Sequence, residues 1–74
     1  MECVSPQPHQ QFGRNVCRLR TDLRMTQEGL AEKADISRRY VQQIEAGQMN
    51  PTIKVVSRMR AALRCSWEEL LRDI

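Results

Sequence analysis

Aromatic side chains are scarce in this sequence of 74 residues, which has one tryptophan, one tyrosine and one phenylalanine. The core of the folded protein must therefore consist mainly of aliphatic side chains. The sequence also lacks any long apolar run, so we expect neither a secretory signal peptide nor a membrane span. A chain of this length has room for one small domain with a single core.

Residues that bind metals or form disulfides are few as well. The three cysteines, Cys3, Cys17 and Cys65, contain no C-x-x-C pair, and their odd number does not favour a disulfide framework. The one histidine, His9, has no second ligand within reach in the sequence. We therefore expect no metal, no cofactor and no small-molecule ligand, and reduced thiols predict a cytoplasmic protein.

Residue sets that catalyse reactions are also missing. There is no Ser/His/Asp set, no Cys/His pair close together and no phosphate-binding loop, so we do not expect an enzyme. Twelve basic residues against nine acidic ones give a net charge of +3, and this excess favours an anionic partner.

The apolar residues that are present indicate helices. Residues 1–11 include two prolines, three glutamines and no apolar periodicity, so we expect a flexible N-terminal arm there and a domain over residues 12–74. From Phe12 to Arg24, apolar residues recur at spacings of three and four, which predicts a helix with one buried face. That face comprises Phe12, Val16, Leu19 and Leu23.

The stretch from Thr26 to Glu45 has the pattern of a helix-turn-helix. It holds two amphipathic segments, and each opens with a hydroxyl residue, Thr26 or Ser37, that can cap a helix. The short link Ala34-Asp35-Ile36 separates the two segments. In such a motif the second helix, here about residues 37–45, enters the major groove of DNA.

This second helix carries side chains suited to reading base edges. Arg38 and Arg39 can each pair with the O6 and N7 atoms of guanine. Gln43 can pair with adenine, whereas Gln42 is interpreted as a bystander. For Tyr40 two roles stay open. It contacts a base, or its ring packs against the first helix of the motif and only its hydroxyl touches phosphate.

A further helix is predicted after the motif. Gly47 can adopt the left-handed conformation that ends a helix, so the recognition helix should stop there. Thr52 then caps a fourth helix. Its expected buried residues are Ile53, Val56, Met59 and Leu63.

The last residues predict a fifth helix with a surplus of apolar side chains. Ser66 and Glu69 have the spacing of a capping box, so this helix should run to about Asp73. Its apolar residues are Trp67, Leu70, Leu71 and Ile74. They exceed what a small core needs, and we therefore predict that they form a homodimer interface.

Taken together, residues from about Phe12 to Leu71 resemble the Cro and phage-repressor (XRE-like) family of helix-turn-helix regulators. The residues that carry the resemblance, in family order and spacing, are Leu19-Arg20, Thr26-Gln27, Leu30-Ala31, Ile36-Ser37, Val41, Ile44-Glu45, Gly47, Asn50-Pro51-Thr52, Ala62-Leu63 and Trp67-Glu68-Glu69-Leu70-Leu71. A narrower resemblance, on few residues, is to the controller proteins of restriction-modification systems. It is carried by Arg39-Tyr40-Val41 and Gln48-Met49-Asn50-Pro51.

The resemblance implies an all-α, compact five-helix bundle of the lambda-repressor-like type. Such a protein is a transcriptional regulator that binds a palindromic operator in double-stranded DNA as a homodimer. The family's base-contacting positions fall on Arg38, Arg39, Tyr40 and Gln43, and we expect Ser37 at the start of this helix to bind DNA with them. The resemblance places Gln27 on phosphate or against the recognition side chains. It also implies a buried ion pair between Arg20 and Glu45.

Three positions depart from the family, and one alternative function is open. Arg60 occupies a position that is often small and apolar in the family. Asp35 and Arg64 stand where glycine is usual, in the turn and after the fourth helix. Aspartate tolerates a positive φ better than most residues, so we expect the turn to persist. The alternative is a protein-interaction module of the antitoxin or adaptor type, which would use the same helices to hold another protein and would select no DNA sequence.

Overall fold

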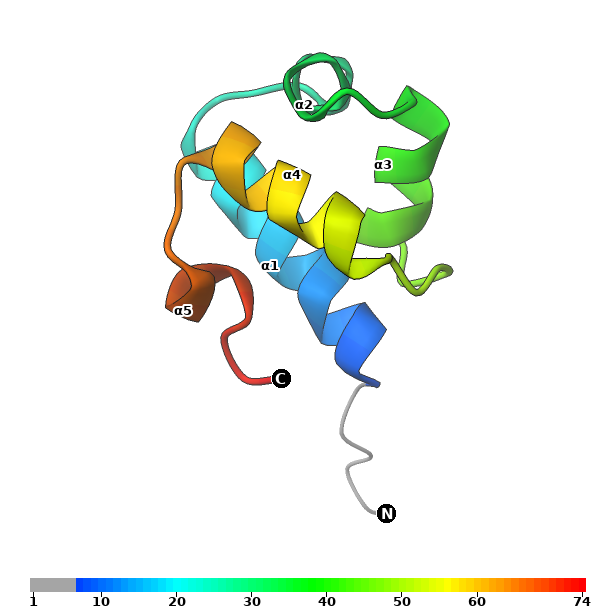
Figure 1. Ribbon diagram of the computed structural model, residues 1–74, viewed down its shortest axis with the longest axis vertical. Coiled ribbons are helices and arrows are strands. Elements are labelled where there is room, and N and C mark those ends of the chain that lie inside the picture. The colour runs from blue at the N-terminus through cyan, green and yellow to red at the C-terminus, as the bar shows by residue number, and fades with distance from the viewer. Residues whose placement is uncertain (1–6) are drawn as a thin grey trace.

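The computed structural model describes residues 7–74, and this part of the chain folds into five helices without strands. The helices are α1 (Pro8–Asp22), α2 (Gln27–Ala34), α3 (Arg38–Glu45), α4 (Ile53–Leu63) and α5 (Trp67–Leu70). Figure 1 shows α1 running through the domain behind α4, with α2 and α3 towards the top and right and α5 at the left. The all-α, five-helix architecture predicted from the sequence is confirmed. None of these helices is long and apolar enough to cross a membrane.

Side-chain caps define where the helices begin. The hydroxyl of Thr26 accepts a hydrogen bond from the Gly29 amide (2.9 Å), and that of Ser37 accepts one from the Tyr40 amide (3.1 Å). The predicted hydroxyl caps of α4 and α5 make the same kind of bond. Each cap satisfies an amide that has no partner inside the helix, which typically contributes about 1 kcal/mol.

Helix α1 begins and ends earlier than predicted. It starts at Pro8, whose fixed φ suits the first turn of a helix, and the Gln7 amide donates to Oε1 of Gln10 (3.0 Å). Residues 8–11 were assigned to a flexible arm, and for them that prediction was wrong. Residues 1–6 of the predicted arm lie outside the described residues. The helix ends at Asp22, two residues before the expected end.

Helix α5 is a single turn rather than the longer helix predicted. Its capping box is present, since Ser66 accepts a hydrogen bond from the Glu69 amide and Glu69 accepts one from the Ser66 amide (both 3.1 Å). The helix ends at Leu70, and Asp73 has a left-handed backbone (φ 62°). The expected extension to Asp73 was wrong because a capping box specifies where a helix starts and not where it stops.

One aliphatic core joins all five helices. Its buried residues are Phe12, Val16, Leu19, Leu30, Ala31, Ala34, Val41, Ile44, Val55, Met59, Leu63, Cys65 and Leu70. Leu23 was predicted to be buried but is half-exposed, because it follows the end of α1. In α4, Val55 is buried in place of Ile53, which is 84% exposed at the first position of the helix.

The close contact between α1 and α3 requires glycine at position 13. A Cβ atom added to Gly13 would overlap the carbonyl oxygen of Ile44 and lie 3.2 Å from that of Glu45. Both oxygens belong to the backbone of the last turn of α3, so they cannot yield unless the helix moves. Gly13 thus lets α1 support the C-terminal end of α3.

Two helices end on non-glycine residues in the left-handed conformation. These are Asp35 after α2 (φ 59°) and Arg64 after α4 (φ 53°), the positions where glycine was expected. The turn at Asp35 persists as predicted. A residue with a Cβ atom is strained in this conformation, and a short aspartate side chain tolerates it better than arginine does.

Replacing Arg64 by glycine should therefore stabilise the domain by about 1 kcal/mol, because glycine occupies the left-handed region without a Cβ clash. Urea unfolding followed by circular dichroism measures the difference. The control is Arg64→Ala, which removes the guanidinium but keeps the Cβ atom and should bring no gain. An equal gain from both variants would contradict the backbone explanation.

Candidate nucleic-acid interface

Helix α3 has one face in the core and the other in solvent. Val41 and Ile44 are fully buried, whereas Arg38, Arg39 and Gln42 are exposed. With 3.6 residues per turn, these exposed positions lie on the side of the helix away from the buried pair. A ridge of long polar side chains therefore faces outward along α3.

The predicted DNA-contacting residues of α3 lie on or beside this ridge, and Gln42 lies on it as well. Ser37 is exposed at the start of the helix, and Gln43 is partly buried on its second turn. Gln42, interpreted from the sequence as a bystander, is exposed like the arginines and lies one turn after Arg38. Its helical spacing from Val41 and Ile44 is the sequence signal that places it outward.

Arg38 and Arg39 bring positive charge to the start of α3. Within residues 7–74, no hydrogen bond or ion pair engages either guanidinium group. Cations at a helix N-terminus oppose the helix dipole, at a typical cost of about 0.3–1 kcal/mol each. An anionic ligand placed against this turn would offset that cost, so the arrangement favours binding of an anion.

Tyr40 lies at the edge of the ridge. Its side chain is partly buried and packs against the hydrophobic core. The choice between the two roles that the sequence left open stays a prediction. A contact between its hydroxyl and DNA stays a prediction.

The last residue of α3, Glu45, joins three helices through its carboxylate. The predicted ion pair with Arg20 of α1 is present, with Nε of Arg20 2.7 Å from Oε2 of Glu45 and Nη2 3.2 Å from Oε1. The amide Nε2 of Gln27, the first residue of α2, donates to the same Oε1 (2.9 Å). The two charged side chains are only 14% and 7% exposed.

Arg20 also bonds the chain that leaves α1. Its Nη1 donates to the carbonyl oxygen of Met25 (2.7 Å), in the link between α1 and α2. The hydrogen bonds to Glu45 raise the pKa of Arg20 above its usual range, so the guanidinium stays charged at physiological pH. We refer to Arg20, Gln27 and Glu45 as the polar clamp.

The resemblance implied that Gln27 contacts phosphate or the recognition side chains, and in the structure its amide bonds Glu45. Its amide braces the end of the recognition helix through Glu45. A phosphate contact by Gln27 stays a prediction, and Gln27 would have to make it while its amide bonds Glu45.

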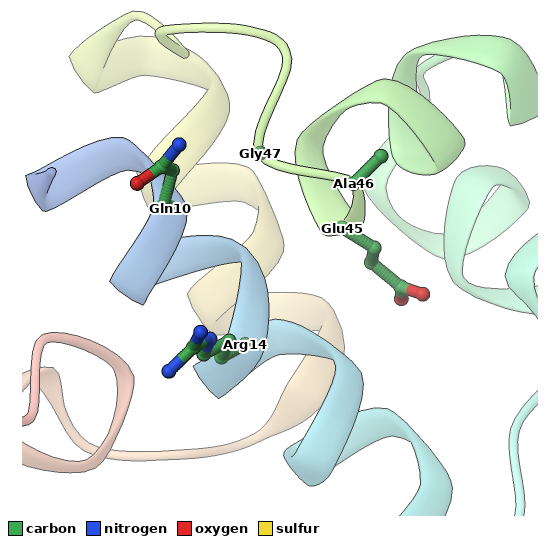
Figure 2. Close-up of a pocket in the computed structure, with 5 residues that line it drawn as sticks. All are labelled: Gln10, Arg14, Glu45, Ala46 and Gly47. Atoms are coloured by element: carbon green, nitrogen blue, oxygen red, sulfur yellow. The ribbon is translucent and has the colours of Figure 1, made fainter. Parts of the chain in front are cut away.

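A polar recess lies beside the clamp, between α1 and the end of α3 (Figure 2). It is lined by Gln10, Arg14, Glu45, Ala46 and Gly47. In Figure 2 the side chains of Arg14 and Glu45 point in different directions, as expected when Glu45 is paired with Arg20. The exposed Arg14 adds positive charge near α3.

A second depression is apolar and lies near the C-terminus. It is lined by Pro8, His9, Phe12, Asn50, Pro51, Val56, Leu71 and Ile74, and we call it the apolar groove. Leu71 and Ile74 are 41% and 53% exposed. Two of the four residues predicted to form a dimer interface therefore lie in an open depression.

The other two predicted interface residues have different surroundings. Leu70 is completely buried in the core of its own chain, so its assignment to an interface was wrong. It is the last residue of α5 and packs inward before the chain turns. Trp67 is about half-exposed, and the guanidinium carbon of Arg60 lies 5.1 Å from its ring centre. This is the distance of a cation–π contact.

Cysteine, histidine and acidic side chains do not gather into a metal site in the described part of the chain. No group of three or more such residues is placed to hold a metal ion there. Cys17 and Cys65 are free thiols, and Cys3 lies outside the described residues.

Two sequence comparisons place the chain among known proteins. Residues 18–70 match the family model HTH_3, described as helix-turn-helix. The uncharacterised HTH-type transcriptional regulator y4dJ of Sinorhizobium fredii is 34% identical over 59 residues, covering 80% of this chain and 77% of that protein.

Solved structures have the same fold. The restriction-modification controller protein C.AhdI from Aeromonas hydrophila has a TM-score of 0.80 at 32% identity, over 84% of this chain and 94% of that chain. The clp gene regulator ClgR from C. glutamicum has a TM-score of 0.87 at 23% identity, over 95% and 90% of the two chains, and at that identity it shows the fold alone. The resemblance to helix-turn-helix regulators and controller proteins predicted from the sequence is confirmed.

Removing the charge of Glu45 should destabilise the domain. Glu45→Gln leaves the Arg20 guanidinium largely buried without a counter-charge, for which we expect a loss of about 3 kcal/mol in the free energy of unfolding. Chemical denaturation measures the loss. Glu32→Gln is the control, because it makes the same change at an exposed position of α2 beyond its first turn and should cost less than about 0.5 kcal/mol. Similar small losses in both variants would contradict a stabilising clamp.

Proposed function

The chain belongs to the HTH_3 helix-turn-helix family of transcriptional regulators, and we propose that it binds a palindromic DNA site as a homodimer with α3 in the major groove. Membership of this family gives the chain a DNA-binding fold and the role of a transcriptional regulator.

The observation that carries the proposal is the outward ridge of α3. Arg38 and Arg39 are exposed, and arginine pairs bidentately with the O6 and N7 atoms of guanine. Gln42 and Gln43 lie one turn further along and can read adenine through its N6 and N7 atoms. The buried face of the helix and the polar clamp hold the backbone behind these side chains, so they project from a rigid support.

Contacts with phosphates would orient the domain on DNA. The amides at the start of α2 and α3 can donate to phosphate oxygens, and Gln27 lies at the first of these sites. Arg14, Arg18 and Arg24 are exposed and supply positive charge from α1 and the chain after it. Such contacts strengthen binding to any sequence, whereas the ridge of α3 would distinguish one sequence from another.

The apolar groove supports a dimer of two identical chains. Two-fold dimers pair the same surface on both subunits, so a groove rimmed by exposed Leu71 and Ile74 can receive the same residues from a second copy. Asn50 and Pro51, which line the groove, follow α3 by only a few residues. A partner seated there would place two recognition helices near the symmetry axis, for half-sites about one helical turn apart.

DNA binding should decrease steeply with salt and should depend on Arg39. Neutralised phosphates release counterions, so the logarithm of the association constant should fall linearly with the logarithm of the salt concentration. Arg39→Ala should weaken binding to a duplex selected by the parent protein by about 1–3 kcal/mol, the discrimination of one base pair contact. Fluorescence anisotropy with a labelled duplex measures both effects.

The matched control for Arg39→Ala is Arg64→Ala, which removes an equal charge from an exposed position at the end of α4. It should leave the affinity for the selected duplex nearly unchanged. A flat salt dependence would overturn DNA binding, and equal losses in the two variants would overturn the assignment of Arg39 to base contact.

A charge in the apolar groove should prevent dimerisation. Leu71→Glu would place a carboxylate where two copies meet, and we expect the dimer dissociation constant to rise by at least about tenfold. Sedimentation equilibrium measures it. Leu23→Glu makes the same change at a half-exposed leucine at the far end of α1 and should have no effect. An unchanged dissociation constant for Leu71→Glu would remove the groove from the interface.

A further inference from the structure

The one buried polar residue among residues 7–74 is Asn15, which is 3% exposed in the middle of α1. Burial of an amide side chain is costly unless its hydrogen bonds are satisfied. Asn15 does not touch the polar clamp or the ridge of α3 through any of its bonds. Two of its three partners lie at the other end of the chain.

Asn15 bonds two carbonyl groups of the C-terminal segment. Its Nδ2 donates to the carbonyl oxygens of Leu70 (2.8 Å) and Arg72 (2.9 Å), which uses both hydrogens of the amide. Its Oδ1 accepts from Nε2 of Gln11, one turn earlier in α1 (3.1 Å). A flipped amide would set oxygen against two carbonyl oxygens, so these partners determine its orientation.

The two carbonyl groups depend on this side chain. Helix α5 is one turn long, and no backbone amide within the described residues donates to the carbonyl of Leu70 or Arg72. After Leu70, the single backbone bond within the segment runs from the Ile74 amide to the Leu71 carbonyl. Apart from the bonds of Asn15, residues 71–74 are held to the domain by the Leu71 amide, which donates to the Trp67 carbonyl (2.9 Å), and by the contacts of Leu71 and Ile74 in the apolar groove.

This segment carries the side chains that rim the apolar groove. Leu70 is buried just before it, and Leu71 and Ile74 lie in the groove beside Phe12 and Val56. The bonds from Asn15 are made to residues on either side of Leu71. They therefore set the direction in which Leu71 and Ile74 are presented.

We propose that Asn15 is a positioning residue for dimerisation, whose side-chain amide holds the C-terminal segment so that Leu71 and Ile74 can meet a second copy of this chain. This role rests on the homodimer of the proposed function. It makes self-association depend on a residue of α1 that lies outside the interface itself.

The test uses Asn15→Leu, which keeps a side chain of similar size in the core and removes both donors. The control is Gln11→Ala, which removes the bond to Oδ1 and leaves both donors of Asn15 in place. Melting of the circular dichroism signal verifies that each variant is folded. If Asn15→Leu does not fold, Asn15→Ala, which also lacks the two donors and adds no bulk or charge to the core, takes its place.

Two measurements are made on each variant. The first is the rate of trypsin cleavage after Arg72, followed by loss of the terminal dipeptide in mass spectrometry, at a concentration where the parent protein is monomeric. The second is the dimer dissociation constant from sedimentation equilibrium. We expect Asn15→Leu to raise both the cleavage rate and the dissociation constant by at least about tenfold, and Gln11→Ala to change each by less than about threefold.

The other outcomes overturn the proposal in distinguishable ways. Unchanged cleavage in Asn15→Leu would show that the amide does not hold the segment. Faster cleavage with an unchanged dissociation constant would show that the held segment does not position the interface. A parent protein that stays monomeric at every concentration would overturn the proposed homodimer and, with it, this role of Asn15.

Discussion

The arrangement of the first three helices depends on how the carboxylate of Glu45 is held. It accepts hydrogen bonds from the guanidinium of Arg20 in α1 and from the amide of Gln27 in α2, and it belongs to the last turn of α3. A buried charge that loses its partners destabilises the folded protein, so these bonds hold the three helices in their relative positions. These hydrogen bonds are made at the C-terminal end of α3, so they do not involve the exposed side chains of its outward ridge.

The arginines are divided between the polar clamp and the outward ridge of α3. Arg20 is paired inside the protein, whereas Arg38 and Arg39 at the start of α3 are exposed. The ion pair of Arg20 fixes the end of α3, whereas Arg38 and Arg39 are proposed to contact phosphates or base edges. Asn15 gives a similar division in the middle of α1, where one buried amide holds a segment that presents exposed apolar side chains.

Much of the fold could be predicted from the sequence because its signals are local. Thr26 and Ser37 cap the two helices of the motif, and Asp35 accepts the left-handed conformation between them. The partner of Arg20 is 25 residues away, and resemblance to a family was needed to identify it. Features set by packing between distant segments escaped prediction. The end of α5, and hence the burial of Leu70, is one example. Asn15 is another, since its spacing from Phe12 and Leu19 places it on the buried stripe without indicating its partners.

Helix α3, supported by the polar clamp, is proposed to read DNA as one half of a symmetric pair. The most direct test is to let the purified protein select binding sites from a pool of random-sequence duplexes and to sequence the bound fraction. We expect one enriched motif made of two inverted half-sites whose centres lie about one helical turn apart. Failure to enrich any motif, or enrichment of a site without two-fold symmetry, would contradict this function.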